Sequence, residues 1–167
     1  MKQIFSAIIL TLMLTACGTM FKSAEEKAAY EAGITQQVVE NLENRHYVID
    51  VTYMRPRGSM LPPRRVTNFS LEVKGDTVVS YLPYFGEVWG SAYNYGGPSG
   101  LNFTGIIREY IEQSAGRDLE RIQFVTDSKE DRYLFMLDIF SNGKTTISVI
   151  GENRQSIDFD GDMRLKY

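Results

Sequence analysis

The chain is 167 residues long and carries 18 basic and 21 acidic side chains, for a formal net charge of −3. This length suits one domain with a sizeable core, and the mildly acidic balance argues against nucleic acid as a partner. With 43% hydrophobic and 23% charged residues, the composition is that of a globular protein. A single cysteine and a single histidine exclude a disulfide framework, a histidine-based catalytic triad and a multi-histidine metal site.

Residues 1–16 have the layout of a bacterial secretory leader. Lys2 supplies a positive charge, and residues 4–13 form an apolar run. That run is too short to cross a bilayer as a helix, which takes about 20 residues. It is followed by Leu14-Thr15-Ala16-Cys17, which fits the lipobox, the signal at which a bacterial lipoprotein is cleaved and its cysteine acylated. The sequence therefore predicts a lipoprotein signal peptide over residues 1–16.

Cys17 is the predicted lipidation site, and its acyl chains are the predicted contact with the membrane. Residues 17–22 are then a lipidated tether, and residues 23–167 form a single globular domain. Gly18 stands where an aspartate would commonly retain a lipoprotein in the inner membrane. We therefore expect an exported cell-envelope protein held on the outer membrane, and we leave open whether it faces the periplasm or the surface.

A helix is predicted over residues 23–45. Ser23 and Glu26 have the spacing of a capping box at its start. Apolar positions recur at helical spacing: Ala28, Ile34, Val38 and Leu42. A helix with one apolar face packs that face against another element. We expect this one to pack on a sheet or to plug one end of it.

From Tyr47 onward the hydrophobic period changes to two, which is typical of half-buried strands. In the first predicted strand, 47–53, one face carries Tyr47, Ile49, Val51 and Tyr53, and a loop with several prolines follows over 55–65. Further strands are predicted over 66–74, 77–82, 101–103, 119–126, 132–140, 145–150 and 156–159. Residues 106–113 fit either a helix or a strand, and we favour a strand. Gly75-Asp76 and Asn142-Gly143 predict hairpins.

The sum is an α+β fold that is mostly β. We expect an N-terminal helix packed on a curved antiparallel sheet of about seven to eight strands, because the predicted strands are short and mostly joined by tight turns.

Residues 83–98 combine aromatic rings with residues that break regular structure, namely Pro83, Gly86, Gly90, Gly96 and Gly97. The candidate binding surface that we assign to this segment and the strand before it comprises Tyr81, Tyr84, Phe85, Trp89, Tyr93 and Tyr95. Aromatic residues are enriched at recognition surfaces, so these rings could grip a protein or stack on sugars. The alternative is a structural lid that folds back over an open end of the sheet.

Three segments together resemble the domain of unknown function 4251 family. They are the run LEVKGDTVVSYLPYFG over 71–86, residues 93–103 with Gly96-Gly97 and Leu101-Asn102-Phe103, and the run NRQSIDFDG over 153–161. The similarity covers roughly residues 25–163. The resemblance implies a small exported lipoprotein of a Gram-negative anaerobe with one domain and no established activity. It supplies no catalytic residue.

Other polar clusters are weaker candidates. Asp158, Asp160 and Asp162 resemble the start of a calcium loop, but Met163 stands where that loop needs glycine, so no metal is expected. His46 follows the predicted helix end and is expected to be structural. Four arginines of the proline-containing loop could meet lipid head groups or an acidic glycan, or simply be solvated: Arg55, Arg57, Arg64 and Arg65.

No catalytic constellation is present in the sequence, and we expect neither a catalytic residue nor a cofactor. Our leading hypothesis is a lipid-anchored, non-enzymatic binding module whose partner is an envelope protein or a glycan. One alternative is a carrier that holds a small apolar or sugar ligand inside the sheet. A less favoured alternative is a glycan-acting enzyme that uses two carboxylates, for which the chain offers Asp50, Glu72, Glu87 and Asp138.

Overall fold

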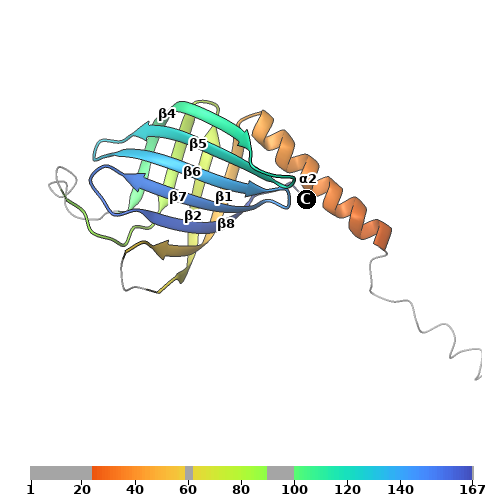
Figure 1. Cartoon of the computed structure of the whole chain (residues 1–167), viewed down its shortest axis with the longest axis horizontal. Helices are drawn as coiled ribbons and strands as arrows, with labels where there is room; N and C mark the ends of the chain where they lie inside the picture. The colour runs from red at the N-terminus through yellow and green to blue at the C-terminus, as the bar shows by residue number, and fades with distance from the viewer. Residues whose placement is uncertain (1–23, 59–61, 90–99, 167) are drawn as a thin grey trace, which may run out of the picture. The chain divides into compact units, whose positions relative to one another are not determined.

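The computed structural model describes residues 24–58, 62–89 and 100–166 (Figure 1). The predicted leader, the lipidation site Cys17 and the aromatic residues Tyr93 and Tyr95 all lie outside the described residues.

Helix α2 covers Ala24–Glu43 and confirms the predicted helix. Glu25 and Glu26 lie in its first turn, where negative charge is favourable to the helix dipole. Val38 and Leu42 are buried in the hydrophobic core, and Ile34 packs partly buried against it. Among the described residues, no helix has both the length and the apolar character needed to span a membrane.

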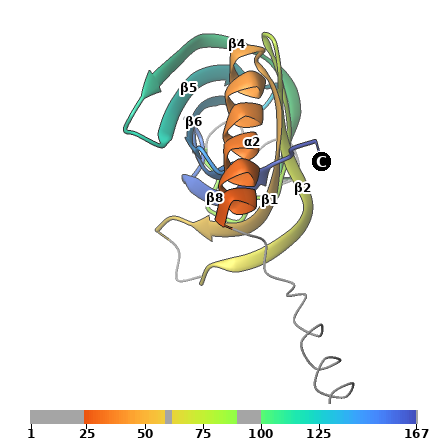
Figure 2. The ribbon, with the colours of Figure 1, turned by 90° about the vertical axis from the view of Figure 1, so that its right-hand side faces the viewer.

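Eight strands follow the helix, and each pairs with the next in an antiparallel ladder. Their bounds are β1 His46–Pro56, β2 Arg64–Lys74, β3 Thr77–Leu82, β4 Leu101–Ser114, β5 Leu119–Asp127, β6 Arg132–Phe140, β7 Lys144–Gly151 and β8 Ile157–Met163. The last strand, β8, also pairs with β1, so the sheet closes into a barrel (Figure 2). The mostly β fold with one N-terminal helix is therefore confirmed. The predicted curved sheet is curved enough to close on itself as a barrel.

Several strands are longer than their predicted counterparts. Residues 101–103 and 106–113 belong to one strand, β4, which runs through Gly105. A Cβ atom at this position would collide with the hydroxyl of Thr126 on β5. The absence of a side chain at Gly105 therefore lets β4 pass Thr126 without interruption. The predicted loop over 55–65 is also too long, because β1 continues to Pro56 and β2 begins at Arg64.

A β-bulge in β1 changes which side chains face the barrel interior. The register shifts between Val51 and Tyr53 in the pairing of β1 with both of its neighbours. As a result Met54 is fully buried, whereas Tyr53 is only partly buried. The prediction that Tyr53 shares the buried face of Tyr47, Ile49 and Val51 is therefore wrong, because the extra residue reverses the alternation.

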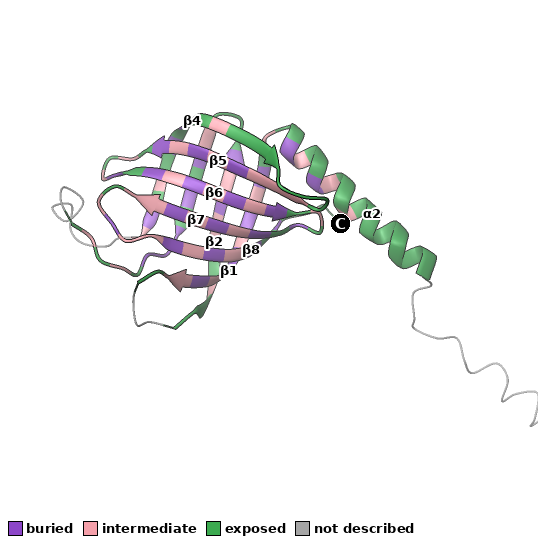
Figure 3. Ribbon diagram, in the orientation of Figure 1, coloured by how far each residue is buried: buried purple, intermediate pink, exposed green. Residues whose placement is uncertain are grey.

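The barrel interior is filled by side chains. Buried and half-buried or exposed positions alternate along most strands, as the bands in Figure 3 show. Phe124 and Phe135 stack at 5.1 Å between ring centroids inside the barrel. The other large side chains with almost no exposed surface include Tyr47, Ile49, Met54, Leu71, Leu82, Leu101, Ile122, Tyr133, Leu137 and Phe159.

Candidate functional site

The structure divides the predicted aromatic surface into one buried ring and three exposed ones. Tyr84 is buried, with 4% of its surface exposed. Tyr81, Phe85 and Trp89 are 51%, 45% and 48% exposed, respectively. We call these three side chains the aromatic end. One ring of the predicted surface therefore packs into the core, and the other three described rings are open to solvent.

The segment that carries the aromatic end is fixed by a short antiparallel pairing. Val88 forms a β-bridge with Arg154. The Trp89 backbone N–H donates to the carbonyl of Asn153 at 2.9 Å, and the Gln155 N–H donates to the carbonyl of Glu87 at 2.9 Å. These bonds link the residues after β3 to those between β7 and β8. Although the segment lacks regular structure of its own, its described part has a defined position.

The Tyr84 side chain adds a further link between these two segments. Its hydroxyl lies 2.8 Å from the carbonyl oxygen of Glu87 and 2.9 Å from that of Gln155. Burial raises the Tyr84 pKa to about 12, because an ionised phenol would be poorly solvated there. Tyr84 therefore stays neutral at physiological pH and can act as a hydrogen-bond donor to these carbonyls.

Beneath this pairing lies a buried ion pair that sequence reasoning missed. The side chains of Arg154 and Asp131 are 2% and 0% exposed, and Arg154 Nε donates to Asp131 Oδ2 at 3.2 Å. Asp131 also accepts bonds from the backbone N–H groups of Arg132 and Asn153 and from the Asn153 side-chain amide. The Asp131 carboxylate thus fixes residues 153 and 154, and these residues pair with the segment that carries the aromatic end.

Aromatic rings and a glycine complete the setting of the Arg154 guanidinium. Its central carbon lies 5.0 Å from the centroid of the Tyr84 ring and 5.2 Å from that of Tyr133, which are distances at which a cation and a ring attract. A Cβ atom at Gly151 would lie 2.6 Å from both Asp131 Oδ2 and the Arg154 side chain. The bare glycine therefore makes room for the pair.

The exposed rings of the aromatic end have partners of their own. Tyr81 stacks on Phe69 of β2 with 5.3 Å between centroids. The guanidinium of Arg64, at the start of β2, lies 5.1 Å from the centroid of Phe85. These contacts restrict the rings of Tyr81 and Phe85, while about half of the surface of each of the two residues remains open to solvent.

The arginines that we considered for lipid or glycan contact are engaged within the protein. Arg55 and Arg57 form ion pairs with Asp160 and Asp158 of β8, at 2.7 and 2.6 Å. The Arg65 guanidinium lies 5.9 Å from the centroid of the Tyr53 ring. The predicted loop cluster is thus distributed along the outer face of the barrel, where two of its members neutralise acidic residues.

Arginines also engage two of the four carboxylates that we considered for catalysis. Asp50 pairs with Arg164, and Asp138 accepts two bonds from Arg121, at 2.7 and 2.9 Å. His46 is exposed at the start of β1. Within the described part of the chain, no group of three histidine, cysteine, aspartate or glutamate side chains is arranged to hold a metal ion.

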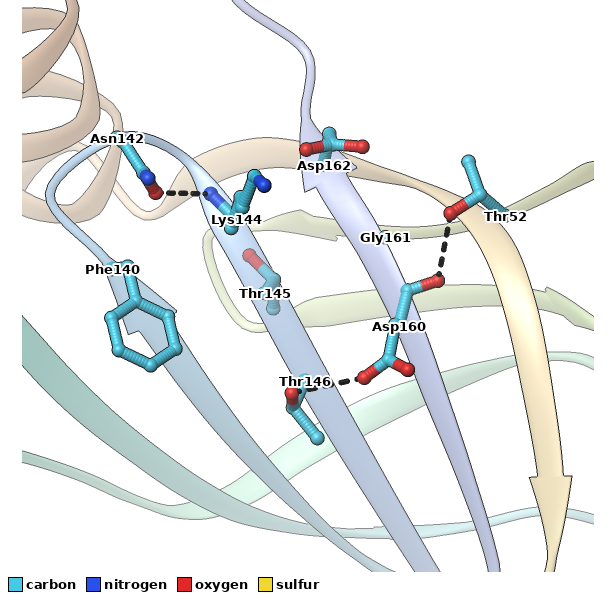
Figure 4. A pocket seen from close by; sticks show the side chains of 9 residues that line it. All are labelled: Thr52, Phe140, Asn142, Lys144, Thr145, Thr146, Asp160, Gly161 and Asp162. Atoms are coloured by element: carbon cyan, nitrogen blue, oxygen red, sulfur yellow. Dashed lines mark hydrogen bonds between the residues drawn. The ribbon is translucent and has the colours of Figure 1, made fainter. Parts of the chain in front are cut away.

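A second surface feature lies on the barrel wall. It is a hollow of about 460 Å³ (Figure 4). It lies over the end of β6, the start of β7, the end of β8 and the bulge of β1. Its lining side chains include Thr52, Phe140, Asn142, Lys144, Thr146, Asp160 and Asp162. Sequence reasoning did not single out this hollow, because it is assembled from residues at opposite ends of the chain that become neighbours only when β8 pairs with β1.

Comparison with known proteins gives a consistent result. The model of the family described as "Domain of unknown function (DUF4251)" matches residues 29–163. The crystal structure of a DUF4251 family protein from Bacteroides eggerthii is similar to this chain, with a TM-score of 0.62 and 13% sequence identity. That similarity covers 81% of this chain and 89% of the other, and at this identity it shows the fold alone. No curated protein matches the chain.

Proposed function

The chain belongs to the family described as domain of unknown function DUF4251, and we propose that it acts as a non-enzymatic binding module anchored by lipid in the cell envelope. In this proposal the aromatic end, Tyr81, Phe85 and Trp89, contacts a partner protein of the envelope. Cys17 carries the acyl chains that keep the module at the membrane.

The observation that carries the proposal is the combination of exposed rings with a fixed frame. Phe85 and Trp89 expose almost half of their surface, although Tyr84 of the same segment is buried. Aromatic side chains held in one position lose little conformational entropy on binding, which is why such residues contribute strongly to interfaces. The backbone supports that preorganisation, because the Trp89 N–H donates to Asn153 and the Glu87 carbonyl accepts from Gln155.

The filled interior supports binding at the surface over the carrier hypothesis. A carrier needs an apolar cavity that encloses most of its ligand. In the described barrel the corresponding space holds stacked rings, with Tyr110, Phe124 and Phe135 in nearly parallel planes. An enzyme is less favoured because two of its four candidate carboxylates, Asp50 and Asp138, are in ion pairs with arginines.

The membrane anchor is tested separately from the binding surface. We expect metabolic labelling with radioactive palmitate to mark the wild-type protein, and we expect Cys17→Ala to abolish the label and release the protein from the membrane fraction. Retention of label in the variant would contradict the assignment of Cys17. Fractionation of inner and outer membranes then tests the expected outer-membrane location.

The binding surface is tested by purification from detergent-solubilised envelopes with mass spectrometry of what co-purifies. The wild-type chain is compared with the double variant Phe85→Ala/Trp89→Ala and with Ile106→Ala. Ile106 is a matched control, because it is an exposed apolar residue, 61% exposed, on the outer face of β4. We expect a stoichiometric envelope protein with the wild type and the control, and its loss from the double variant. Equal recovery with all three chains would contradict the proposal.

A further inference from the structure

The hollow on the barrel wall combines one exposed aromatic ring with several polar side chains. Phe140, at the end of β6, is 43% exposed although it is fully apolar. In Figure 4 its ring lies on one side of the hollow, while Asp160 and Thr52 lie on the other and β7 runs between them. The volume of about 460 Å³ falls within the range of small-molecule sites.

Asp160 is held in one orientation with part of its carboxylate still available. Arg55 donates to Oδ1 at 2.7 Å, and the Thr146 hydroxyl donates to the same oxygen at 3.1 Å. Among the described residues no hydrogen bond reaches Oδ2, which remains an acceptor at the edge of the hollow. A carboxylate fixed in this way can accept a bond from a ligand without losing side-chain entropy on binding.

The bulge in β1 directs a further polar group to the same place. Thr52 is the residue between Val51 and Tyr53, where the register shifts, and its hydroxyl donates to the backbone carbonyl of Asp160 at 3.3 Å. Bulges are common beside functional sites because they re-aim a side chain. Here the bulge brings a hydroxyl to the rim of the hollow.

Lys144 and Asp162 complete the lining with opposite charges. They are paired positions of β7 and β8, yet within the described chain their side-chain charges form no ion pair within 4.0 Å. Both are exposed. An ammonium group and a carboxylate are therefore both available to a ligand in the same hollow.

These groups define the chemistry of the ligand. The charges balance once Arg55 is counted with Asp160, so neither an anion nor a cation is favoured as a whole. A fully apolar ligand would cover donors and acceptors without satisfying them, which is costly. A neutral sugar suits the lining, because its hydroxyl groups both donate and accept while the C–H face of its ring can lie against an aromatic ring.

We propose that this hollow, lined by Phe140, Lys144, Asp160 and Asp162, is a binding site for neutral saccharide units of a glycan. Phe140 provides the stacking surface, the two carboxylates accept hydroxyl bonds, and Lys144 donates to a ring or hydroxyl oxygen. The site goes beyond the proposed contact of the aromatic end with an envelope protein, and it involves none of the same residues.

The experiment uses the full chain, labelled with ¹⁵N, in a detergent without a sugar head group. Maltose, cellobiose, lactose and chitobiose are the neutral probes, and sialyllactose is the anionic probe, each at millimolar concentration. We expect at least one neutral disaccharide to shift the amide signals of residues 140–146 and 160–162. We expect sialyllactose to bind no more tightly than lactose, because the lining favours no net charge.

Two variants test the assignment, and one control separates it from the aromatic end. Phe140→Ala should weaken the affinity for that disaccharide by about tenfold. Asp162→Asn, which preserves shape, should also weaken it, whereas Phe85→Ala should leave it unchanged. No shift with any neutral probe, a preference for the anionic probe, shifts confined to other residues, or an affinity unaffected by Phe140→Ala would overturn the proposal. Each of these results leaves the test of the aromatic end unaffected.

Discussion

Two arginine–aspartate pairs of this barrel have the same chemistry and opposite surroundings. Arg154 and Asp131 are 2% and 0% exposed, whereas Arg121 and Asp138 on the outer face are 43% and 33% exposed. The exposed pair has the better hydrogen-bond geometry, with two bonds of 2.7 and 2.9 Å against one of 3.2 Å. Hydrogen-bond geometry alone would therefore predict that the exposed pair contributes more to stability, whereas we expect the opposite.

Burial reverses that order because neither buried charge can fall back on water. If Asp138 is lost, solvent replaces it around Arg121, and little free energy changes. If Asp131 is lost, Arg154 remains buried between Tyr84 and Tyr133 with only the partly exposed Glu130 as a counter-charge. Asp131 also holds the backbone of Asn153, whose carbonyl accepts the bond from Trp89. The buried pair is thus the one on which the aromatic end depends.

The largest expected effect is that of Asp131→Asn. The new amide would place a donor opposite the Arg154 Nε donor and leave Glu130, whose Oε2 lies 3.3 Å from the guanidinium, as the remaining counter-charge. Because the buried charge loses its closer, fully buried partner, we expect a loss of about 3 kcal/mol in the free energy of unfolding. Urea unfolding followed by far-ultraviolet circular dichroism measures it. Because Trp89 is the only tryptophan, its fluorescence reports separately on the aromatic end, and we expect it to change in the native state.

Its control is a double-mutant cycle with Arg154→Leu. Removing the arginine as well removes the buried charge that lost its main partner, so the double variant should be destabilised by less than the sum of the two single variants. If the two losses simply added, Asp131 would act through its backbone bonds to Arg132 and Asn153 and not through the charge of Arg154.

Local features of this fold were predictable from the sequence, whereas features that depend on closure were not. Gly75 and Gly143 adopt positive φ angles of 58° and 82° in the two hairpins that their turn residues indicate. The strands were predictable because hydrophobic residues recur at every second position. The pairing of β1 with β8 aligns residues about a hundred positions apart, such as Arg55 with Asp158, and no local pattern encodes it.

The candidate sites divide in the same way. The aromatic end could be proposed from Tyr81, Phe85 and Trp89 because rings beside glycines and a proline are conspicuous in a sequence. Asp131 and Arg154 were missed because they are common residue types separated by 23 positions, and only burial makes them unusual. The hollow beside Phe140 was missed because the bulge at Thr52 and the closure of the barrel create it.

An intermediate effect is expected from alkaline pH, acting on the buried tyrosines. Tyr84 has a pKa raised from 10.0 to about 12, and burial also raises the pKa values of Tyr47 and Tyr133. Above pH 10 the unfolded chain loses these protons while the folded chain keeps them, so the free energy of unfolding should fall as the pH rises from 10 toward 12. Urea unfolding at a series of pH values measures this slope.

The matched variant for the pH effect is Tyr84→Phe. At neutral pH it should cost about 1 kcal/mol, since the carbonyls of Glu87 and Gln155 lose a hydrogen-bond donor. Above pH 10 its decline should be shallower than that of the wild type, because one titrating group is gone. If the free energy of unfolding of the variant fell as steeply with pH as that of the wild type, Tyr84 would ionise as readily in the folded chain as in the unfolded one.

The smallest expected effect is that of Asp138→Asn, which completes the comparison of the two ion pairs. The substitution removes the charge that faces Arg121 but keeps the shape, and both side chains remain in contact with water. We expect a loss in the free energy of unfolding roughly tenfold smaller than that of Asp131→Asn, and we expect it to fade as salt screens the pair. Urea unfolding at low and high salt measures both. A loss as large as that of Asp131→Asn would mean that hydrogen-bond geometry, and not burial, sets the importance of a pair in this barrel.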